Sequence, residues 1–302
     1  MGIKKRWIAF FLVGILGITV LLYASDTRLI DLHVKSGEYE EAIRLYENVL
    51  FTQPQNARLH YELANVFLLA DRSNEALEYL HKAYALGDNS DRLLRQLYSA
   101  YQKNENRNGM ITMLETLVKR HPKDRNQRAQ LAALYAWADQ PDAAITHYRY
   151  LLEHEPDNAE FVYKLSSLYQ ADQSYAKAAV VLENYRTYAP SDEKASHLLA
   201  DVYLADGRWK KAAAYYEQFV RDNPADIALR DRLVEIYKWK KKAPRALPHL
   251  HYLADAEFAS RATYRNQFLA LSRQYEPLHA VHYLENRLKM EPENTNVHLE
   301  LA

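Results

Sequence analysis

The stretch GRWKKA, Gly207 to Ala212, followed by Pro224, contains the pattern that decides the fold. The stretch GEYEEA, Gly37 to Ala42, followed by Pro54, shows the same pattern nearer the N-terminus. The two are separated by a multiple of 34 residues, and prolines recur at that period between and beyond them. A long series at one fixed period indicates a chain built from internal repeats. The prolines in this register are Pro54, Pro122, Pro156, Pro190, Pro224 and Pro292, and Asp88 and Phe258 occupy the two gaps.

Three further series share this period. A small residue where two helices cross lets their backbones approach, and large apolar residues fill the contact around it. Proline ends the second helix because it lacks the N–H that the next turn requires. One hairpin cannot bury its apolar face, so neighbouring hairpins must stack. The series are Ala42, Ala76, Ala144, Ala178, Ala212, Ala246 and Ala280, with Met110 as the exception; Leu63, Leu97, Leu131, Leu165, Leu199 and Leu233; and Tyr101, Tyr135, Tyr169, Tyr203 and Tyr237.

On these residues the chain resembles the tetratricopeptide repeat (TPR) family, whose unit is a helix-turn-helix of 34 residues. The resemblance covers essentially all of the chain from Tyr23 to Ala302. It implies an all-α fold, a right-handed superhelix (α-solenoid) of about eight repeats, which binds other proteins and has no catalytic site. The expected repeats lie near 23–56, 57–90, 91–124, 125–158, 159–192, 193–226, 227–260 and 261–294, and a ninth starts at 295–302.

Two departures from the pattern have structural consequences. The seventh repeat lacks the closing proline and has Pro244 and Pro248 in its second helix instead. Pro244 fits the first turn of a helix, whereas Pro248 predicts a kink and a local change in the superhelix path. The sequence also stops at Leu301 and Ala302, early in the ninth repeat. Because solenoids need a terminal cap, we expect the natural chain to continue further.

The N-terminus predicts a membrane anchor. Residues 1–6 include Lys4, Lys5 and Arg6, and residues 7–23 (WIAFFLVGILGITVLLY) are uncharged. A helix of that length just spans a bilayer core, and the basic residues before it favour a cytoplasmic N-terminus. The repeats, residues 24–302, would then lie in the periplasm of a bacterial inner-membrane protein. A cleaved signal peptide is the competing interpretation, although the best cleavage candidate, after Ala24, has bulky Leu22 at the minus-three position, where a small residue is required.

Composition and motifs exclude several function classes. Lys plus Arg and Asp plus Glu both total 39, so no global positive charge favours nucleic acid as a partner. The chain contains no cysteine, which excludes disulfides and thiolate chemistry. The isolated glycines build no phosphate-binding loop, and the pair His279 and His282 has no acidic partner at metal-site spacing. We therefore expect no enzyme activity, no cofactor and no metal.

In the TPR family, which the chain resembles, the first helices of successive repeats line a concave groove. The 34-residue register identifies the positions on these helices that face outward. Repeats two and three present a basic and aromatic surface suited to acidic peptides. Trp137 and Trp239 each follow a tyrosine of the register by two residues and should leave the core, as interface tryptophans do. The candidate groove contacts are Arg58, Tyr61, Asn65, Arg92, Arg95, Gln102, Lys103, Trp137, Tyr163, His197, Asp201, Asp231, Glu235 and Trp239.

The leading functional hypothesis is a membrane-anchored scaffold for protein–protein interaction in a bacterial envelope complex. An anchor followed at once by such repeats is similar to exopolysaccharide secretion proteins of the PelB kind, so biofilm export is the narrower hypothesis. Two alternatives remain open: a groove that binds a charged polysaccharide, and an assembly factor for envelope enzymes. The basic segment Lys119 to Arg128 could attract an acidic partner or polyanion.

Overall fold

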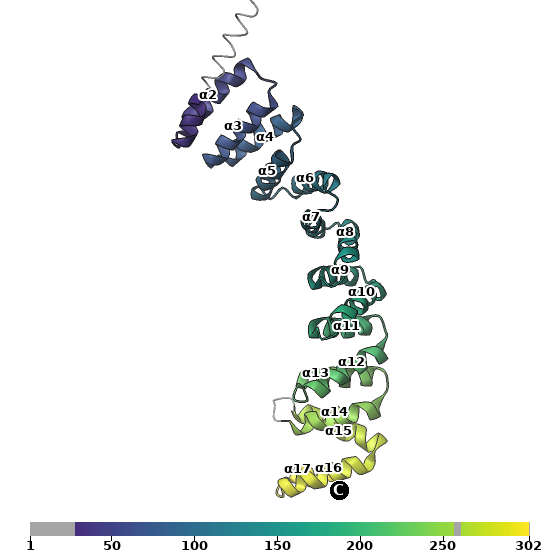
Figure 1. Ribbon diagram of the computed structural model, residues 1–302. Coiled ribbons are helices and arrows are strands. Elements are labelled where there is room, and N and C mark those ends of the chain that lie inside the picture. The colour runs from purple at the N-terminus through teal and green to yellow at the C-terminus, as the bar shows by residue number, and fades with distance from the viewer. Residues whose placement is uncertain (1–27, 257–260, 302) are drawn as a thin grey trace, which may run out of the picture. The chain divides into compact units, whose positions relative to one another are not determined.

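The computed structural model describes residues 28–256 and 261–301, which form helices joined by short turns, without a strand (Figure 1). The expected all-α repeat architecture is confirmed. Residues 28–35 are helical, and the helices after them are α2 (Tyr39–Thr52), α3 (Ala57–Leu69), α4 (Ser73–Ala85), α5 (Asp91–Lys103), α6 (Arg107–Arg120), α7 (Arg125–Trp137), α8 (Pro141–His154), α9 (Ala159–Ala171), α10 (Tyr175–Tyr188), α11 (Glu193–Ala205), α12 (Trp209–Asp222), α13 (Ile227–Trp239), α14 (Ala243–Asp255), α15 (Arg261–Tyr275), α16 (Pro277–Met290) and α17 (Thr295–Leu301).

The first helix of each hairpin begins at a fixed place in the 34-residue register because a short polar side chain caps it. The odd-numbered helices from α3 to α13 each follow an Asn, Ser or Asp whose side-chain oxygen accepts the backbone N–H three residues further on. Such a cap satisfies a donor that the helix leaves open, which stabilises the helix by about 1 kcal/mol. The caps are Asn56, Ser90, Asp124, Asn158, Asp192 and Asp226.

The turn inside each hairpin contains one residue in the left-handed backbone region, again at a fixed register position. At this turn position Gly37 and Gly207 adopt the conformation without steric cost, because glycine has no Cβ. The other hairpins place a non-glycine residue there, namely Asp71, Glu105, Asp139, Gln173 and Lys241. The eighth hairpin differs, because α15 extends to Tyr275 and only Glu276 separates it from α16.

The core consists of the residues that the sequence periodicity selects. The register alanines named above are at most 2% exposed, and so are the register leucines. The register tyrosines are also buried, with Tyr237 fully enclosed. Met110, the exception in the alanine series, is buried as well, at 5% exposure. The periodic pattern therefore identifies the helix-crossing positions correctly.

The described helices form two compact units that divide within α8, between Leu151 and Leu152. In the first unit α2 to α7 pack consecutively, each against the next. In the second unit α9 to α17 pack in the same consecutive way. Contacts between neighbours along the chain are typical of repeat proteins, in which each repeat is stabilised by the adjacent ones.

The two prolines of the seventh repeat both lie within α14. Pro244 occupies the first turn, as predicted, where a helix has no hydrogen bond to lose. Pro248 lies further inside, and the helix continues past it to Asp255. The helix therefore tolerates the loss of one backbone donor, since its apolar face, including Leu247 and Leu250, stays buried.

A tyrosine–carboxylate hydrogen bond recurs between adjacent repeats. The register tyrosine of a first helix donates its hydroxyl to a glutamate on the second helix of the preceding repeat. Within the described residues the pairs are Tyr135 with Glu115, Tyr203 with Glu183 and Tyr237 with Glu217. In the third repeat Tyr101 makes the equivalent contact with His81, at 3.0 Å. These bonds fasten consecutive hairpins, and burial together with Glu217 raises the pKa of Tyr237 to about 12.

Replacing Tyr203 with phenylalanine should lower the free energy of unfolding at pH 7 by about 1 kcal/mol, because it removes this hydrogen bond. The Tyr203 hydroxyl is the largest influence holding the pKa of Glu183 below its ordinary value. A carboxylate with a lowered pKa stabilises the fold above its ordinary pKa, and that stabilisation disappears as the pH falls through the lowered value. Urea unfolding should therefore show the difference from wild type shrinking below about pH 4. Tyr188→Phe, at an exposed tyrosine, is the control, and an unchanged difference at low pH would refute the link to Glu183.

No helix among residues 28–256 and 261–301 combines the length and apolar character needed to cross a membrane. The predicted anchor, residues 7–23, lies outside the residues that the structure describes.

Candidate partner-binding surfaces

Two of the candidate residues in the second repeat are occupied by neighbouring side chains. Tyr61 was expected to face outward, but it is only 8% exposed, and Arg92 of the next first helix lies over its ring at 5.3 Å. Asn65 accepts a hydrogen bond from Gln96. Arg58 remains open to solvent and pairs with Glu62 at 2.7 Å. The first helices α3 and α5 are thus joined by polar contacts along this surface.

The third repeat presents a basic cleft of about 530 Å³ beside α5. His121 and Arg120 both contact Asp91, and hydrogen bonds from these two side chains hold the pKa of the Asp91 carboxyl below its ordinary value. Arg95 and Lys123 complete the positive lining of the cleft. Gln102 and Lys103 lie exposed further along α5. The arrangement suits a carboxylate or another anionic group.

Trp137 lies at the end of α7 and is 48% exposed, as its register position predicts. The guanidinium of Arg107 stacks over its ring at 3.8 Å. This cation–π contact covers one face of the indole and leaves the remainder accessible. Trp137 is therefore partly covered by its own chain and partly open to solvent.

In the second unit Tyr163 belongs to a network around Asp192. The Asp192 carboxylate accepts the hydroxyls of Tyr163 at 2.7 Å and Tyr185 at 2.8 Å, and it also caps α11 through the Ala195 N–H. Burial alone would raise the pKa of Asp192, but these hydrogen bonds together hold it below its ordinary value. Tyr163 therefore serves to join two repeats, with Lys194 over its ring.

Asp201 and Asp231 are likewise engaged by neighbouring repeats. Asp201 accepts the hydroxyl of Tyr216 and lies 3.7 Å from Arg232. Burial and a hydrogen bond to Asp231 raise the pKa of Tyr264 to about 12. Both acidic residues thus contribute to contacts between helices as well as to the surface.

Trp239 lies in a cleft of about 440 Å³ whose lining residues all come from the two first helices α11 and α13. Leu204, Ala205 and Ile236 supply the apolar part, and Asp201, Arg232 and Glu235 supply charge. The indole is 59% exposed, and its described partner is Lys240, whose Nζ lies 3.3 Å from the ring centroid. An exposed tryptophan in a cleft of mixed polarity is typical of an interface anchor.

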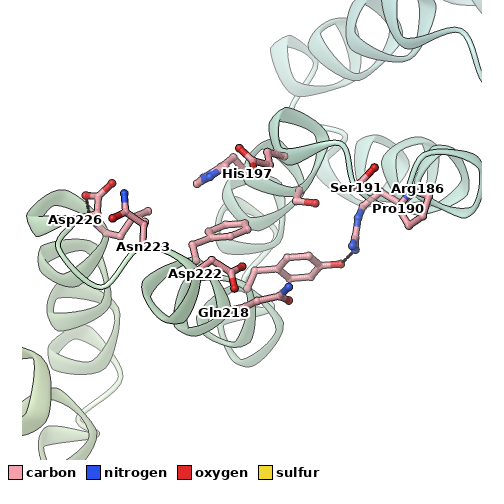
Figure 2. A pocket seen from close by; sticks show the side chains of 13 residues that line it. Arg186, Pro190, Ser191, His197, Gln218, Asp222, Asn223 and Asp226 are labelled. Atoms are coloured by element: carbon pink, nitrogen blue, oxygen red, sulfur yellow. Dashed lines mark hydrogen bonds between the residues drawn. The ribbon is translucent and has the colours of Figure 1, made fainter.

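His197 lies apart from the Trp239 cleft, in a second hollow formed near the start of α11 and the end of α12 (Figure 2). Its imidazole stacks on Phe219, with ring centroids 3.9 Å apart. This pocket has a volume of about 520 Å³ and is lined by side chains from α10 to α13. Sequence reasoning identified His197 but none of the other lining residues.

The described residues contain no group of three or more histidine and acidic side chains placed to hold a metal ion. His279 and His282 both line a hollow between α14 and α16, where His279 pairs with Glu276 at 2.5 Å.

Comparisons with known proteins identify the repeat. Models of the tetratricopeptide repeat match residues 27–91, 135–202 and 193–236, which together make up more than half of the chain. No curated protein sequence matches the chain.

Several solved structures resemble the chain at low sequence identity. A chain of the Naa15/Naa10 complex bound to HypK-THB is 12% identical, with a TM-score of 0.53 over 92% of this chain and 60% of that chain. YrrB, a TPR protein with an unusual peptide-binding site, is 22% identical over 56% of this chain and 88% of its own, with a TM-score of 0.41. A TPR protein from Parabacteroides merdae is 17% identical over 82% and 98%, with a TM-score of 0.42. The chain belongs to the tetratricopeptide repeat family.

Proposed function

We propose that this protein is a non-catalytic scaffold that binds partner proteins through the surface of its first helices. The observation that carries the proposal is the Trp239 cleft, whose lining comes entirely from α11 and α13. TPR proteins generally mediate protein–protein interactions, and a largely exposed indole beside apolar and charged groups is suited to anchor a peptide segment.

We also propose a location for this scaffold. Residues 7–23 anchor the scaffold in the inner membrane of a bacterial envelope, with the N-terminus in the cytoplasm and the repeats in the periplasm. The basic residues before the uncharged run support this orientation. An exopolysaccharide export complex is the setting that the layout of anchor and repeats favours. Removing residues 7–23 should shift the protein from the membrane pellet to the soluble fraction after alkaline extraction, and retention in the pellet would refute the anchor.

Replacing Trp239 with alanine should reduce recovery of the partner from native envelope about tenfold, because truncating an interface anchor removes its buried contact. The measurement is quantitative pull-down with the detergent-solubilised full chain, followed by identification of the retained proteins and glycans. Tyr188→Ala is the matched control, since Tyr188 is 58% exposed but lies on the second helix α10.

The outcomes separate the candidate functions. A protein that wild type and Tyr188→Ala retain, and that Trp239→Ala loses, supports the scaffold and identifies its partner. Retention of a glycan alone would support the polysaccharide-binding function instead of the scaffold. Equal recovery by all three proteins would refute a role for the Trp239 cleft.

A further inference from the structure

The pocket around His197 combines an aromatic wall with three acidic side chains, Glu193, Asp222 and Asp226 (Figure 2). Phe219 and Tyr215 of α12 form the aromatic wall. His197 stacks on one face of Phe219, and the guanidinium of Arg186 lies over Tyr215, 5.0 Å from the ring centroid. Aromatic faces are negative and attract cations. The walls of the pocket therefore favour a positively charged, flat group.

The acidic side chains of the pocket are not all neutralised within the fold. Asp226 is committed as the cap of α13, where it accepts the Leu229 N–H at 3.0 Å. Glu193 and Asp222 also line the pocket, and no hydrogen bond or ion pair engages their carboxylates among the described residues. Two carboxylates thus remain available to a ligand.

Three cations in or beside this pocket are each engaged by groups other than Asp222 and Glu193. Arg186 lines the pocket, and its guanidinium is engaged by the ring and the hydroxyl of Tyr215. Lys194 lies over Tyr163 at 4.3 Å. Arg230 binds the Pro224 carbonyl and stacks over Tyr252 at 3.7 Å. Consequently Asp222 and Glu193 have no cationic partner from the neighbouring described helices.

We propose that this pocket binds the side chain of an arginine presented by a partner protein. A guanidinium can stack on an aromatic face and donate to carboxylates in its plane at the same time, which an ammonium cannot. Guanidinium groups of the chain itself stack on tyrosine rings elsewhere in the fold: Arg128 lies over Tyr150 at 3.8 Å and Arg230 over Tyr252 at 3.7 Å. That a partner protein supplies the arginine rests on the proposed scaffold function, whereas binding of an arginine side chain in this pocket does not.

The test uses a small probe, so that it needs no identified partner. Binding of the tripeptide acetyl-Gly-Arg-Gly-amide to the full chain is measured by saturation-transfer difference NMR. The same peptide with citrulline, which keeps the shape but lacks the charge, and the same peptide with lysine are compared. We expect the arginine peptide to bind, the lysine peptide to bind more weakly and the citrulline peptide not to bind. Equal binding of the arginine and citrulline peptides would overturn the proposal.

Variants place the binding in this pocket. The double variant Glu193→Gln, Asp222→Asn should weaken binding of the arginine peptide about tenfold, because two charge-assisted contacts are lost. The double variant Asp142→Asn, Glu160→Gln removes the same charge from exposed positions outside the pocket and should bind as wild type does. Equal weakening by both pairs would show a diffuse charge effect and refute the site. Trp239→Ala should bind the tripeptide normally, so failure of this pocket and failure of the Trp239 cleft are distinguishable.

Discussion

Replacing Asp192 with alanine is expected to lower the free energy of unfolding by about 3 kcal/mol. The side chain does three things at once, because it caps α11 and accepts the hydroxyls of Tyr163 and Tyr185. Loss of a cap costs about 1 kcal/mol, and each tyrosine hydroxyl left without its acceptor adds about 1 kcal/mol. Tyr185 is only 5% exposed, so water cannot readily replace the lost acceptor.

A matched control separates the cap from the network. Asp124 occupies the same register position and caps α7 through the Gln127 N–H at 3.0 Å, and no tyrosine hydroxyl donates to it in the described structure. Asp124→Ala should therefore cost only about 1 kcal/mol. Urea unfolding gives the two losses, and hydrogen exchange should show faster opening of α9 to α11 in Asp192→Ala. Equal losses for the two variants would contradict a role for the tyrosines.

The sequence predicted the packing positions better than the caps, for a physical reason. Few residue types other than alanine fit at a helix crossing, so alanine recurs visibly at 34-residue spacing. A cap needs only a short side chain with an oxygen acceptor, and Asn56, Ser90 and Asp124 meet that need with different residues. The cap series lies in the same register, and searching for shared chemistry instead of shared identity would have found it.

The candidate surface was predicted only in part, because register gives the direction of a side chain but not what covers it. Trp239 is 59% exposed whereas Tyr237 is fully buried, as their register positions predict. Tyr61 and Tyr163 also point from first helices, yet residues about one repeat further along the chain engage them. The pocket around His197 was missed since it combines side chains from four helices and their turns.

Gly109 directly precedes Met110, the exception in the alanine series, and replacing Gly109 with alanine should destabilise the protein. A Cβ atom at Gly109 would lie 2.6 Å from the ring of Tyr101. That ring is buried at 7% exposure, and its hydroxyl is held by His81 at 3.0 Å, so it cannot easily move. The absence of a side chain at position 109 therefore leaves room for the Tyr101 ring.

The expected loss for Gly109→Ala is about 2 kcal/mol, since overpacking costs up to about 3 kcal/mol and helix propensity returns about 1 kcal/mol. Ala143→Gly, at the same register position in α8, is the opposite control and should cost about 1 kcal/mol through propensity alone. The decisive measurement is urea unfolding of Gly109→Ala in a Tyr101→Leu background, where the ring is absent. There the alanine should no longer destabilise and should add about 1 kcal/mol, because only its helix propensity remains. A loss of the same size in both backgrounds would show that the Tyr101 ring is not the obstacle.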